Sequence, residues 1–227
     1  MAKILCIETS TTNCSVAIAE NGKLLALAED DSNSYSHAEQ LHVFIQQLFD
    51  AANLSASDLH AVAVSKGPGS YTGLRIGVST AKGLCFALGI PLISVPTLEV
   101  LARQVVQDDS SFPVIAMIDA RRMEVYSSVF DSKYQTIQDV TAKILDENAY
   151  AELFKTHEKL YAIGNGVTKF KEITSTAENF IFIEDRNPSA KEMLTIAEQK
   201  YSNKDFEDVA YFEPYYLKDF VGGKKKT

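Results

Sequence analysis

The 227-residue chain is predicted to be an α/β protein with two lobes, each a mixed sheet with helices. Two observations predict this fold. Stretches typical of strand–turn–strand open each half of the chain, and segments with helical spacing follow each of them. The polar stretch QDDSSFP, residues 107–113, separates the halves. We therefore expect an N-terminal lobe over residues 1–107 and a C-terminal lobe over 108–189.

Three strands are expected first in the N-terminal lobe, from KILCIETS, CSVAIAE and LLALAED. Asn21–Gly22 between the last two is a strong signal for a two-residue hairpin turn. A helix is then predicted over His37–Ala52, because apolar residues recur at three- and four-residue spacing. Its apolar face comprises Leu41, Phe44, Ile45, Leu48 and Phe49. A buried strand in DLHAVAVS, a helix ending near Leu88, the strand PLISV and a helix capped by Thr97 complete this lobe.

The strand pattern restarts in the C-terminal lobe with VIAMID and EVYSSVF. A helix near Ala149–Lys155, the strand KLYAIG and two further helical segments follow, the last near Ala190–Tyr201. We expect residues 190–220 to pack back on the N-terminal lobe. The ending VGGKKKT, residues 221–227, has no apolar pattern and is expected to be a disordered tail.

Composition limits the classes of function. The formal net charge is -8 and the pI is about 5.1, which disfavours direct binding of a nucleic-acid backbone. The three cysteines show no metal-site or disulfide spacing, and no apolar stretch approaches the ~20 residues that span a bilayer. A cytoplasmic protein that binds no membrane is expected. His37 and His42 are five residues apart, off a common helix face, so no metal site is predicted. No Ser–His–Asp order stands out and no cysteine has an obvious histidine neighbour, so no catalytic residue is predicted.

The stretch SKGPGSYTGLRIG suggests a phosphate-binding loop, but its spacing fits neither common type. No Gly-Lys-Ser/Thr follows the glycines, and the stretch is one residue too long for G-x-G-x-x-G. Small residues instead recur at every fourth position, at Gly69, Gly73, Gly77, Ala81, Cys85 and Gly89. Because glycine within a helix costs roughly 1 kcal/mol relative to alanine, this ridge indicates close approach of another element.

Two interpretations of the ridge remain open. The helix packs tightly on its own sheet, or the ridge receives a helix, either from another chain or from segment 38–52. On the second interpretation we expect a partner interface made of Gly69, Gly73, Leu74, Gly77, Ala81, Leu41, Ile45 and Leu48.

Polar residues end the first strand of each half. Glu8, Thr9 and Ser10 follow the first, and Asp119 with Arg121 follows VIAMI. Carboxylates and hydroxyls at two strand ends favour a cleft between the lobes, a vestige of a nucleotide site. Hydroxyls that only satisfy backbone groups of the turn are an equally good interpretation.

Several stretches together resemble the TsaB (YeaZ) family. They are KILCIETSTTNCSVAIAENGKLL, VAVSKGPGSYTGLRIGVSTAKGLCFALGIPLISVPTLEVLA, MIDARRMEVYSSVF and AIGNG. The resemblance implies the two-lobed actin/Hsp70/sugar-kinase-like (ASKHA) fold. It implies a scaffold without catalytic activity that binds TsaD, with the ATPase TsaE, in the complex that transfers threonylcarbamoyl to the adenosine beside the anticodon of ANN-decoding tRNAs. It also implies that the chain pairs with itself, and that tRNA is contacted only indirectly.

The resemblance further implies that the metal centre of TsaD is absent. TsaD carries a metal-binding H-x-x-x-H after the glycine helix, and here Thr97 and Leu101 stand at those positions. Neither side chain is a metal ligand of that kind, so we expect no metal and no cofactor. The nucleotide clefts of actin-like proteins use Asp and glycine-rich turns, whereas this chain has Glu8 and bulky threonines. The alternatives are a free-standing actin-like nucleotide-binding phosphotransferase and, less well supported, a peptidase.

Overall fold

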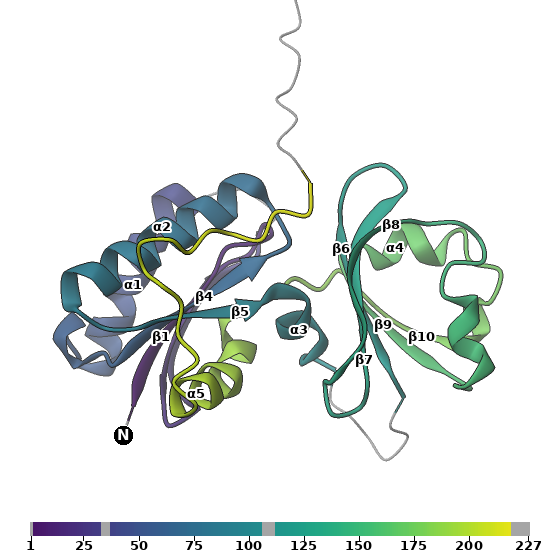
Figure 1. Ribbon diagram of the computed structural model, residues 1–227. Coiled ribbons are helices and arrows are strands. Elements are labelled where there is room, and N and C mark those ends of the chain that lie inside the picture. The colour runs from purple at the N-terminus through teal and green to yellow at the C-terminus, as the bar shows by residue number, and fades with distance from the viewer. Residues whose placement is uncertain (1, 33–36, 106–111, 219–227) are drawn as a thin grey trace, which may run out of the picture.

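The predicted two-lobed α/β architecture is confirmed in a computed structural model that describes residues 2–32, 37–105 and 112–218. Each lobe is built around a five-stranded mixed sheet, and the lobes lie next to each other with helices packed against both sheets (Figure 1). No helix in the described ranges is both long enough and apolar enough to cross a membrane.

The N-terminal lobe and the segment that joins the lobes contain the following elements in chain order: β1 (Lys3–Glu8), β2 (Cys14–Glu20), β3 (Lys23–Asp30), α1 (His37–Ala52), η1 (Ala56–Asp58), β4 (Ala61–Gly67), α2 (Tyr71–Leu88), β5 (Leu92–Pro96) and α3 (Thr97–Ala102). The remaining elements are β6 (Val114–Asp119), β7 (Glu124–Phe130), β8 (Thr136–Ile144), η2 (Ala151–Lys155), β9 (Leu160–Gly164), α4 (Val167–Lys171), η3 (Ala177–Asn179), β10 (Phe180–Glu184), η4 (Ala190–Met193) and α5 (Leu194–Ser202). The expected N-cap at Thr97 is wrong by one residue, since Pro96 occupies the N-cap position of α3.

The N-terminal sheet has the strand order β3-β2-β1-β4-β5. β1, β2 and β3 pair antiparallel, whereas β4 and β5 run parallel to β1. The turn between β2 and β3 is the predicted one: Asn21 and Gly22 both have positive φ, 52° and 71°, as a type I′ hairpin turn requires.

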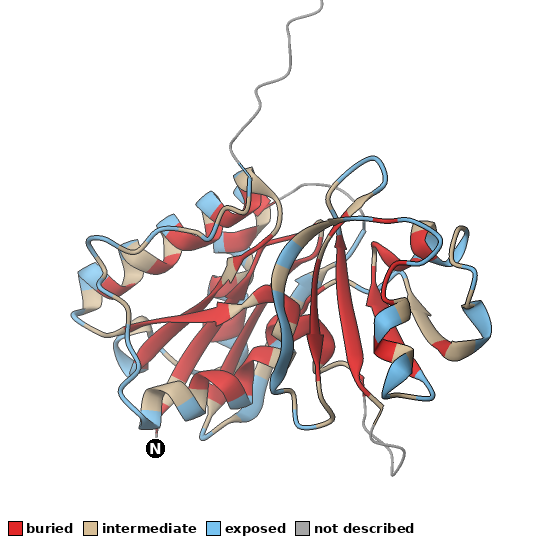
Figure 2. Ribbon diagram, turned by 45° about the vertical axis from the view of Figure 1, so that its right-hand side comes forward, coloured by how far each residue is buried: buried red, intermediate tan, exposed pale blue. Residues whose placement is uncertain are grey.

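Helices cover both faces of this sheet. α1 and α2 lie on one face, and α5 lies on the other (Figure 1). Side chains of β1 point alternately to the two layers: Leu5 and Ile7 pack under α1 and α2, whereas Ile4 and Cys6 face η4 and α5. Burial on both faces explains why this strand is almost continuously apolar. The central strands of both sheets are correspondingly buried (Figure 2), whereas the edge strands β3 and β8 are largely half-buried or exposed.

The C-terminal sheet has the order β10-β9-β6-β7-β8. Its core contains an aromatic cluster in which Phe170 meets Tyr150 and Phe180 edge-on. The predicted helix near 149–155 is a short 3-10 helix, and strands β8 and β10 were not predicted. Most of the expected boundary at 107–113, and the whole tail 221–227, lie outside the described residues.

After α5 the chain returns along the N-terminal lobe as an extended segment, residues 205–218, which we call the C-terminal strap (Figure 1). The Tyr215 N–H donates to the Lys66 carbonyl at 2.7 Å. Lys82 of α2 donates to two strap carbonyls, those of Ala210 and Phe212, at 3.1 and 2.8 Å. At its described end Lys218 pairs with Glu124 of β7, so the strap reaches from one lobe to the other.

Gly69, just before α2, and Gly73 and Gly77 in its first turns face the chain's own β1–β2 turn. A Cβ on Gly73 would lie 2.1 Å from the Thr9 carbonyl oxygen, and a Cβ on Gly69 would lie 2.3 Å from that of Ser10. A Cβ on Gly77 would lie 2.2 Å from the Thr9 hydroxyl. Of the two interpretations of the ridge, close packing within the lobe therefore describes this structure.

The partner interface expected on that ridge stays a prediction, although most of its residues are buried in this structure. Leu74 and Ala81 of α2 are buried, as are Leu41, Ile45 and Leu48 of α1. All except Leu74 belong to the cluster beneath the two helices. Together with Gly69, Gly73 and Gly77 these residues contact their own lobe, and of this set Gly69 also borders the cleft.

Replacing Gly73 by alanine should lower the free energy of unfolding by about 2–3 kcal/mol, because the new methyl group overlaps a backbone carbonyl that cannot rotate away. Gly83, on the same helix, has no heavy atom within 4 Å of an added Cβ among the described residues. Gly83→Ala should therefore raise the free energy of unfolding by about 1 kcal/mol. Urea unfolding of the two variants checks this pair. Equal effects of the two substitutions would contradict the inward placement of Gly73.

Candidate functional site

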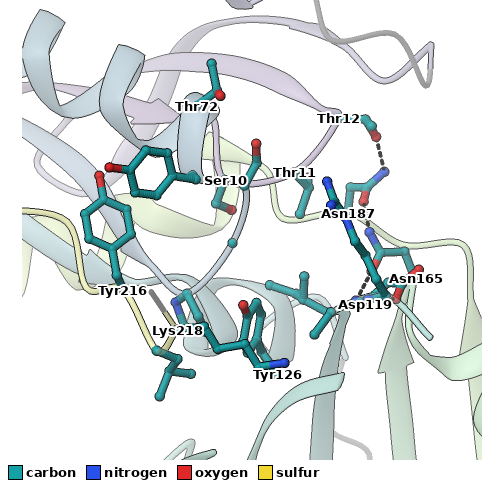
Figure 3. Close-up of a pocket in the computed structure, with 18 of the residues that line it drawn as sticks. Ser10, Thr11, Thr12, Thr72, Asp119, Tyr126, Asn165, Asn187, Tyr216 and Lys218 are labelled. Atoms are coloured by element: carbon teal, nitrogen blue, oxygen red, sulfur yellow. Dashed lines mark hydrogen bonds between the residues drawn. The ribbon is translucent and has the colours of Figure 1, made fainter. Parts of the chain in front are cut away.

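A cleft of about 950 Å³ lies between the lobes (Figure 3). The N-terminal lobe contributes the β1–β2 turn and the start of α2, and the C-terminal lobe contributes the β6–β7 turn and the Gly164–Gly166 turn. Strap residues Tyr215–Lys218 form a further wall. The cleft is therefore bordered mainly by turns and by the strap.

The start of α2 is anchored to the β1–β2 turn. The Ser70 N–H donates to the Ser10 carbonyl at 2.6 Å, and the Ser70 hydroxyl accepts the Gly73 N–H at 3.3 Å as the helix N-cap. Residues 69–72 line the cleft. The positive end of the α2 dipole is thus directed to this space.

A chain of side-chain amides crosses the other side of the cleft. The Asn165 carbonyl oxygen accepts the Asp119 N–H at 2.8 Å, and its amide donates to Asn187 at 2.9 Å. Asn187 in turn donates to Asp31 of the N-terminal lobe at 2.6 Å. Neither asparagine was singled out in the sequence, where only the GNG turn around Asn165 gave a signal. Their role depends on contacts between residues far apart in the chain.

The structure places the predicted cleft residues in two groups. Ser10, Asp119 and Arg121 line the cleft. Glu8 and Thr9 do not: both are fully buried, and the Thr9 hydroxyl donates to the Gly73 carbonyl at 2.8 Å. The expectation that Glu8 and Thr9 border the cleft is therefore corrected, because the packing of α2 turns them inward.

Glu8 is a buried carboxyl with one satisfied oxygen. Its Oε1 accepts the Ser10 N–H at 2.7 Å and the Ser65 hydroxyl at 2.9 Å. Oε2 has no hydrogen-bond partner among the described residues. Burial raises the pKa of Glu8, against the lowering effect of its contacts with Ser10 and Ser65.

Thr97 and Leu101, where the resemblance implies that the histidine pair is missing, belong to the interior. Thr97 is buried, and its hydroxyl accepts the Gly67 N–H at 3.1 Å. Leu101 packs in the core of the C-terminal lobe. Within the described ranges no group of three or more His, Cys, Asp or Glu residues is placed to hold a metal ion.

The outer side of the α1–α2 layer is a second candidate surface. Phe86 on α2 is 85% exposed and Val43 on α1 is 51% exposed. Ser79, Gly83 and Ala87 are also exposed on α2, at four-residue spacing that places them on one stripe. We call this stripe with Phe86 and Val43 the outer helical face.

Replacing Glu8 by glutamine should change how stability depends on pH. The folded protein holds the Glu8 proton at higher pH than the unfolded chain does, so stability from this group is present at acid pH. It is lost as pH rises from the unfolded pKa through the raised folded pKa. Because glutamine does not titrate, the free energy of unfolding of Glu8→Gln should rise relative to that of wild type as pH rises, by up to about 1.4 kcal/mol per pH unit.

Urea unfolding between pH 4 and pH 8 measures this difference, with Glu178→Gln, at an exposed glutamate, as the matched control. A difference between Glu8→Gln and wild type that stays flat across the range would disprove the buried-carboxyl interpretation.

Comparison with known proteins defines the family. A profile of the TsaD family, described as tRNA N6-adenosine threonylcarbamoyltransferase, matches residues 31–221. The tRNA threonylcarbamoyladenosine biosynthesis protein TsaB of Escherichia coli (strain K12) is 29% identical over 229 residues, which is 98% of this chain and 97% of that protein. The TsaB of Bacillus subtilis (strain 168) is 28% identical, over 95% of this chain and 93% of that protein.

Solved structures of similar fold agree with these sequence relatives. YeaZ from Pseudomonas aeruginosa superposes with a TM-score of 0.81 at 25% identity, over 96% of this chain and 100% of that one. Component A of the (R)-2-hydroxyglutaryl-CoA dehydratase of Acidaminococcus fermentans, at 9% identity and a TM-score of 0.50, shares the fold alone. The predicted actin/Hsp70/sugar-kinase-like class is thereby confirmed. With the match to the family profile and the two mixed sheets, these comparisons show that the chain belongs to the TsaD family and, within it, to the TsaB (YeaZ) family.

Proposed function

We propose that this chain is a subunit without catalytic activity that binds a TsaD protein, together with the ATPase TsaE, in the formation of threonylcarbamoyladenosine in tRNA. The names of its relatives support the pathway. The observation that carries the proposal is the outer helical face, where an exposed phenylalanine lies beside a glycine in the middle of a helix.

Gly83 supports a protein partner at this face. Glycine in the middle of a helix lowers stability by about 1 kcal/mol relative to alanine. Gly69, Gly73 and Gly77 are explained by the β1–β2 turn, but an added Cβ on Gly83 would meet nothing within 4 Å in the described chain. A bare backbone beside Phe86, which is 85% exposed, lets another helix approach closely. TsaD, or a second copy of this chain, is the proposed occupant.

The interior of the lobes supports a role without catalysis. Thr97 is buried and is not among the residues that line the cleft; its hydroxyl accepts the Gly67 N–H. Glu8, the carboxyl at the end of β1, is buried behind the β1–β2 turn. Neither residue is positioned to hold a metal ion or to activate a substrate, so the chemistry is proposed to belong to TsaD.

Replacing Phe86 by glutamate, or Gly83 by leucine, should reduce binding to TsaD at least tenfold while the chain stays folded. The first change puts a charge, and the second puts bulk, where close approach is needed. Titration calorimetry with purified TsaD measures the affinity, and circular dichroism verifies folding. Ile144→Glu, at a 73% exposed apolar residue of the C-terminal lobe, is the control and should bind normally. Wild-type affinity of both α2 variants would rule this face out.

The isolated chain should transfer no threonylcarbamoyl to tRNA when it is supplied with threonylcarbamoyl-adenylate, and should not turn over Mg-ATP. Addition of TsaD should restore transfer, because the proposed chemistry resides there. Modified adenosine is measured by mass spectrometry of digested tRNA. Transfer by the chain alone would refute the scaffold proposal, and Mg-ATP turnover by the chain alone would favour the phosphotransferase.

A further inference from the structure

We propose that the C-terminal strap is part of the docking surface on the outer helical face, with Tyr211 as a second aromatic anchor beside Phe86, and that the negative charge of this enlarged surface selects its partner. The partner carries cationic side chains around an apolar pocket, and it is TsaD rather than a second copy of this chain. This surface extends the face named in the proposed function, on which the proposal therefore rests.

The strap follows α2 along most of its length, in the opposite direction. The Glu207 N–H donates at 2.9 Å to the carbonyl of Leu92, beyond the C-terminus of α2. At the other end the ring centroids of Tyr216 and Tyr71, the first residue of α2, are 4.6 Å apart. Between these ends Lys82 of α2 donates to two carbonyls of the strap. The strap and the helix therefore form one continuous surface.

Tyr211 lies where the middle of α2 binds the strap. Lys82 donates to the carbonyls of Ala210 and Phe212, the residues on either side of Tyr211. Lys82 is four residues before Phe86, so these two side chains lie on the same side of the helix. Tyr211 is 84% exposed, and of the large apolar and aromatic side chains in the described ranges only Phe86 is more exposed. The fold thus brings its two most exposed side chains of this kind to one part of α2.

The backbone around Tyr211 is held in a tight turn. One carboxylate oxygen of Asp208 accepts the N–H groups of Ala210 and Tyr211, at 2.7 and 3.1 Å. The Asp208 carbonyl accepts the Phe212 N–H at 2.8 Å, and Phe212 packs against the core beneath α1 and α2. Such an ordered backbone with an exposed ring suits an anchor, because binding then immobilises only the side-chain torsions of the tyrosine.

Carboxylates surround the two aromatic anchors. α1 contains Glu39 and Asp50 but no lysine or arginine. Residues 205–213 of the strap contain four carboxylates and no cation, and all four lie within six residues of Tyr211. Because charges act over a Debye length of ~10 Å at 0.1 M salt, a partner docked on Tyr211 meets their negative potential.

The cations next to this surface are few and already engaged. Arg75 of α2 lies over a tyrosine ring, and Lys82 is bound to the strap carbonyls. Lys200 of α5 pairs with Asp205 at 2.9 Å. Two copies of the chain that paired through this face would therefore bring like charges together, which opposes association. A partner with lysines or arginines around an apolar pocket would be attracted, and the aromatic anchors would fill the pocket.

Replacing Tyr211 by alanine should weaken binding to TsaD at least ~fivefold, because it removes an anchor from the interface. Calorimetry with the full chain and purified TsaD at 50 mM NaCl measures the affinity. The Tm should not fall, since the ring is exposed. Ile144→Ala, at the exposed residue of the C-terminal lobe used above as a control, should bind normally.

The pattern across variants separates this proposal from the proposed function. Normal binding of Tyr211→Ala together with weakened binding of Phe86→Glu would overturn the role of the strap and leave the proposed function in place. Normal binding of Phe86→Glu and Gly83→Leu would rule out the outer helical face, and the enlarged surface with it. A lower Tm of Tyr211→Ala would show that the ring serves the fold and would also overturn the proposal.

Salt and one neutral substitution test the selection by charge. Affinity for TsaD should fall at least ~threefold between 50 and 300 mM NaCl, whereas self-association, measured by sedimentation velocity, should be no stronger at 50 mM. Asp208→Asn keeps the acceptor oxygen of the turn, and it should weaken TsaD binding about twofold at 50 mM NaCl but not at 300 mM. Glu178→Gln, at an exposed glutamate of the C-terminal lobe, is the control.

Two results would overturn the selection by charge. One is an affinity for TsaD that does not fall with salt or with Asp208→Asn. The other is self-association that is tighter than TsaD binding at 50 mM NaCl, because the acidic face would then favour a second copy.

Discussion

The rest of the structure depends on the contact between the first turns of α2 and the β1–β2 turn. Gly73 and Gly77 allow the helix backbone to touch Thr9, and the Thr9 hydroxyl bonds to the Gly73 carbonyl at 2.8 Å. The Ser70 N–H closes the contact on the Ser10 carbonyl. Because the contact is made mainly by backbone atoms, which cannot move aside as a flexible side chain can, it fixes both the depth of the helix on the sheet and the direction of its N-terminus.

This contact also decides which polar residues of the turn remain available. Thr9 and Glu8 are used to hold α2 and β4, through Gly73 and Ser65. Ser10 and Thr11 lie one step further along the turn and border the cleft instead. A carboxylate that serves the core is poorly placed to serve a metal or a substrate, since exposing it would break its bonds to Ser10 in the turn and to Ser65 in β4. The packing of α2 and the proposed loss of catalysis thus have a common cause.

Local patterns were sufficient for much of the fold. The Asn21–Gly22 turn fixes the β2–β3 hairpin, and the apolar spacing of α1 gives both its extent and its buried face. The recurrence of small residues at every fourth position of α2 shows that they share a stripe, but it does not show what covers the stripe. That depends on Thr9, some sixty residues away. β8 and β10 were not predicted from the sequence. Both are edge strands, and the mostly exposed β8 has no apolar face that would indicate a strand.

α2 is held by its own chain on several sides, which bears on how it would dock. Its glycine side rests on the β1–β2 turn, and Lys82 holds the strap by two carbonyls. Strap residues Val209 and Phe212 pack against the core beneath the helices. A helix fixed in this way presents Gly83 and Phe86 on a rigid support, so that binding orders few additional groups. Since the ordering of side chains and loops is one cost of association, such a rigid support would favour the docking proposed for this face.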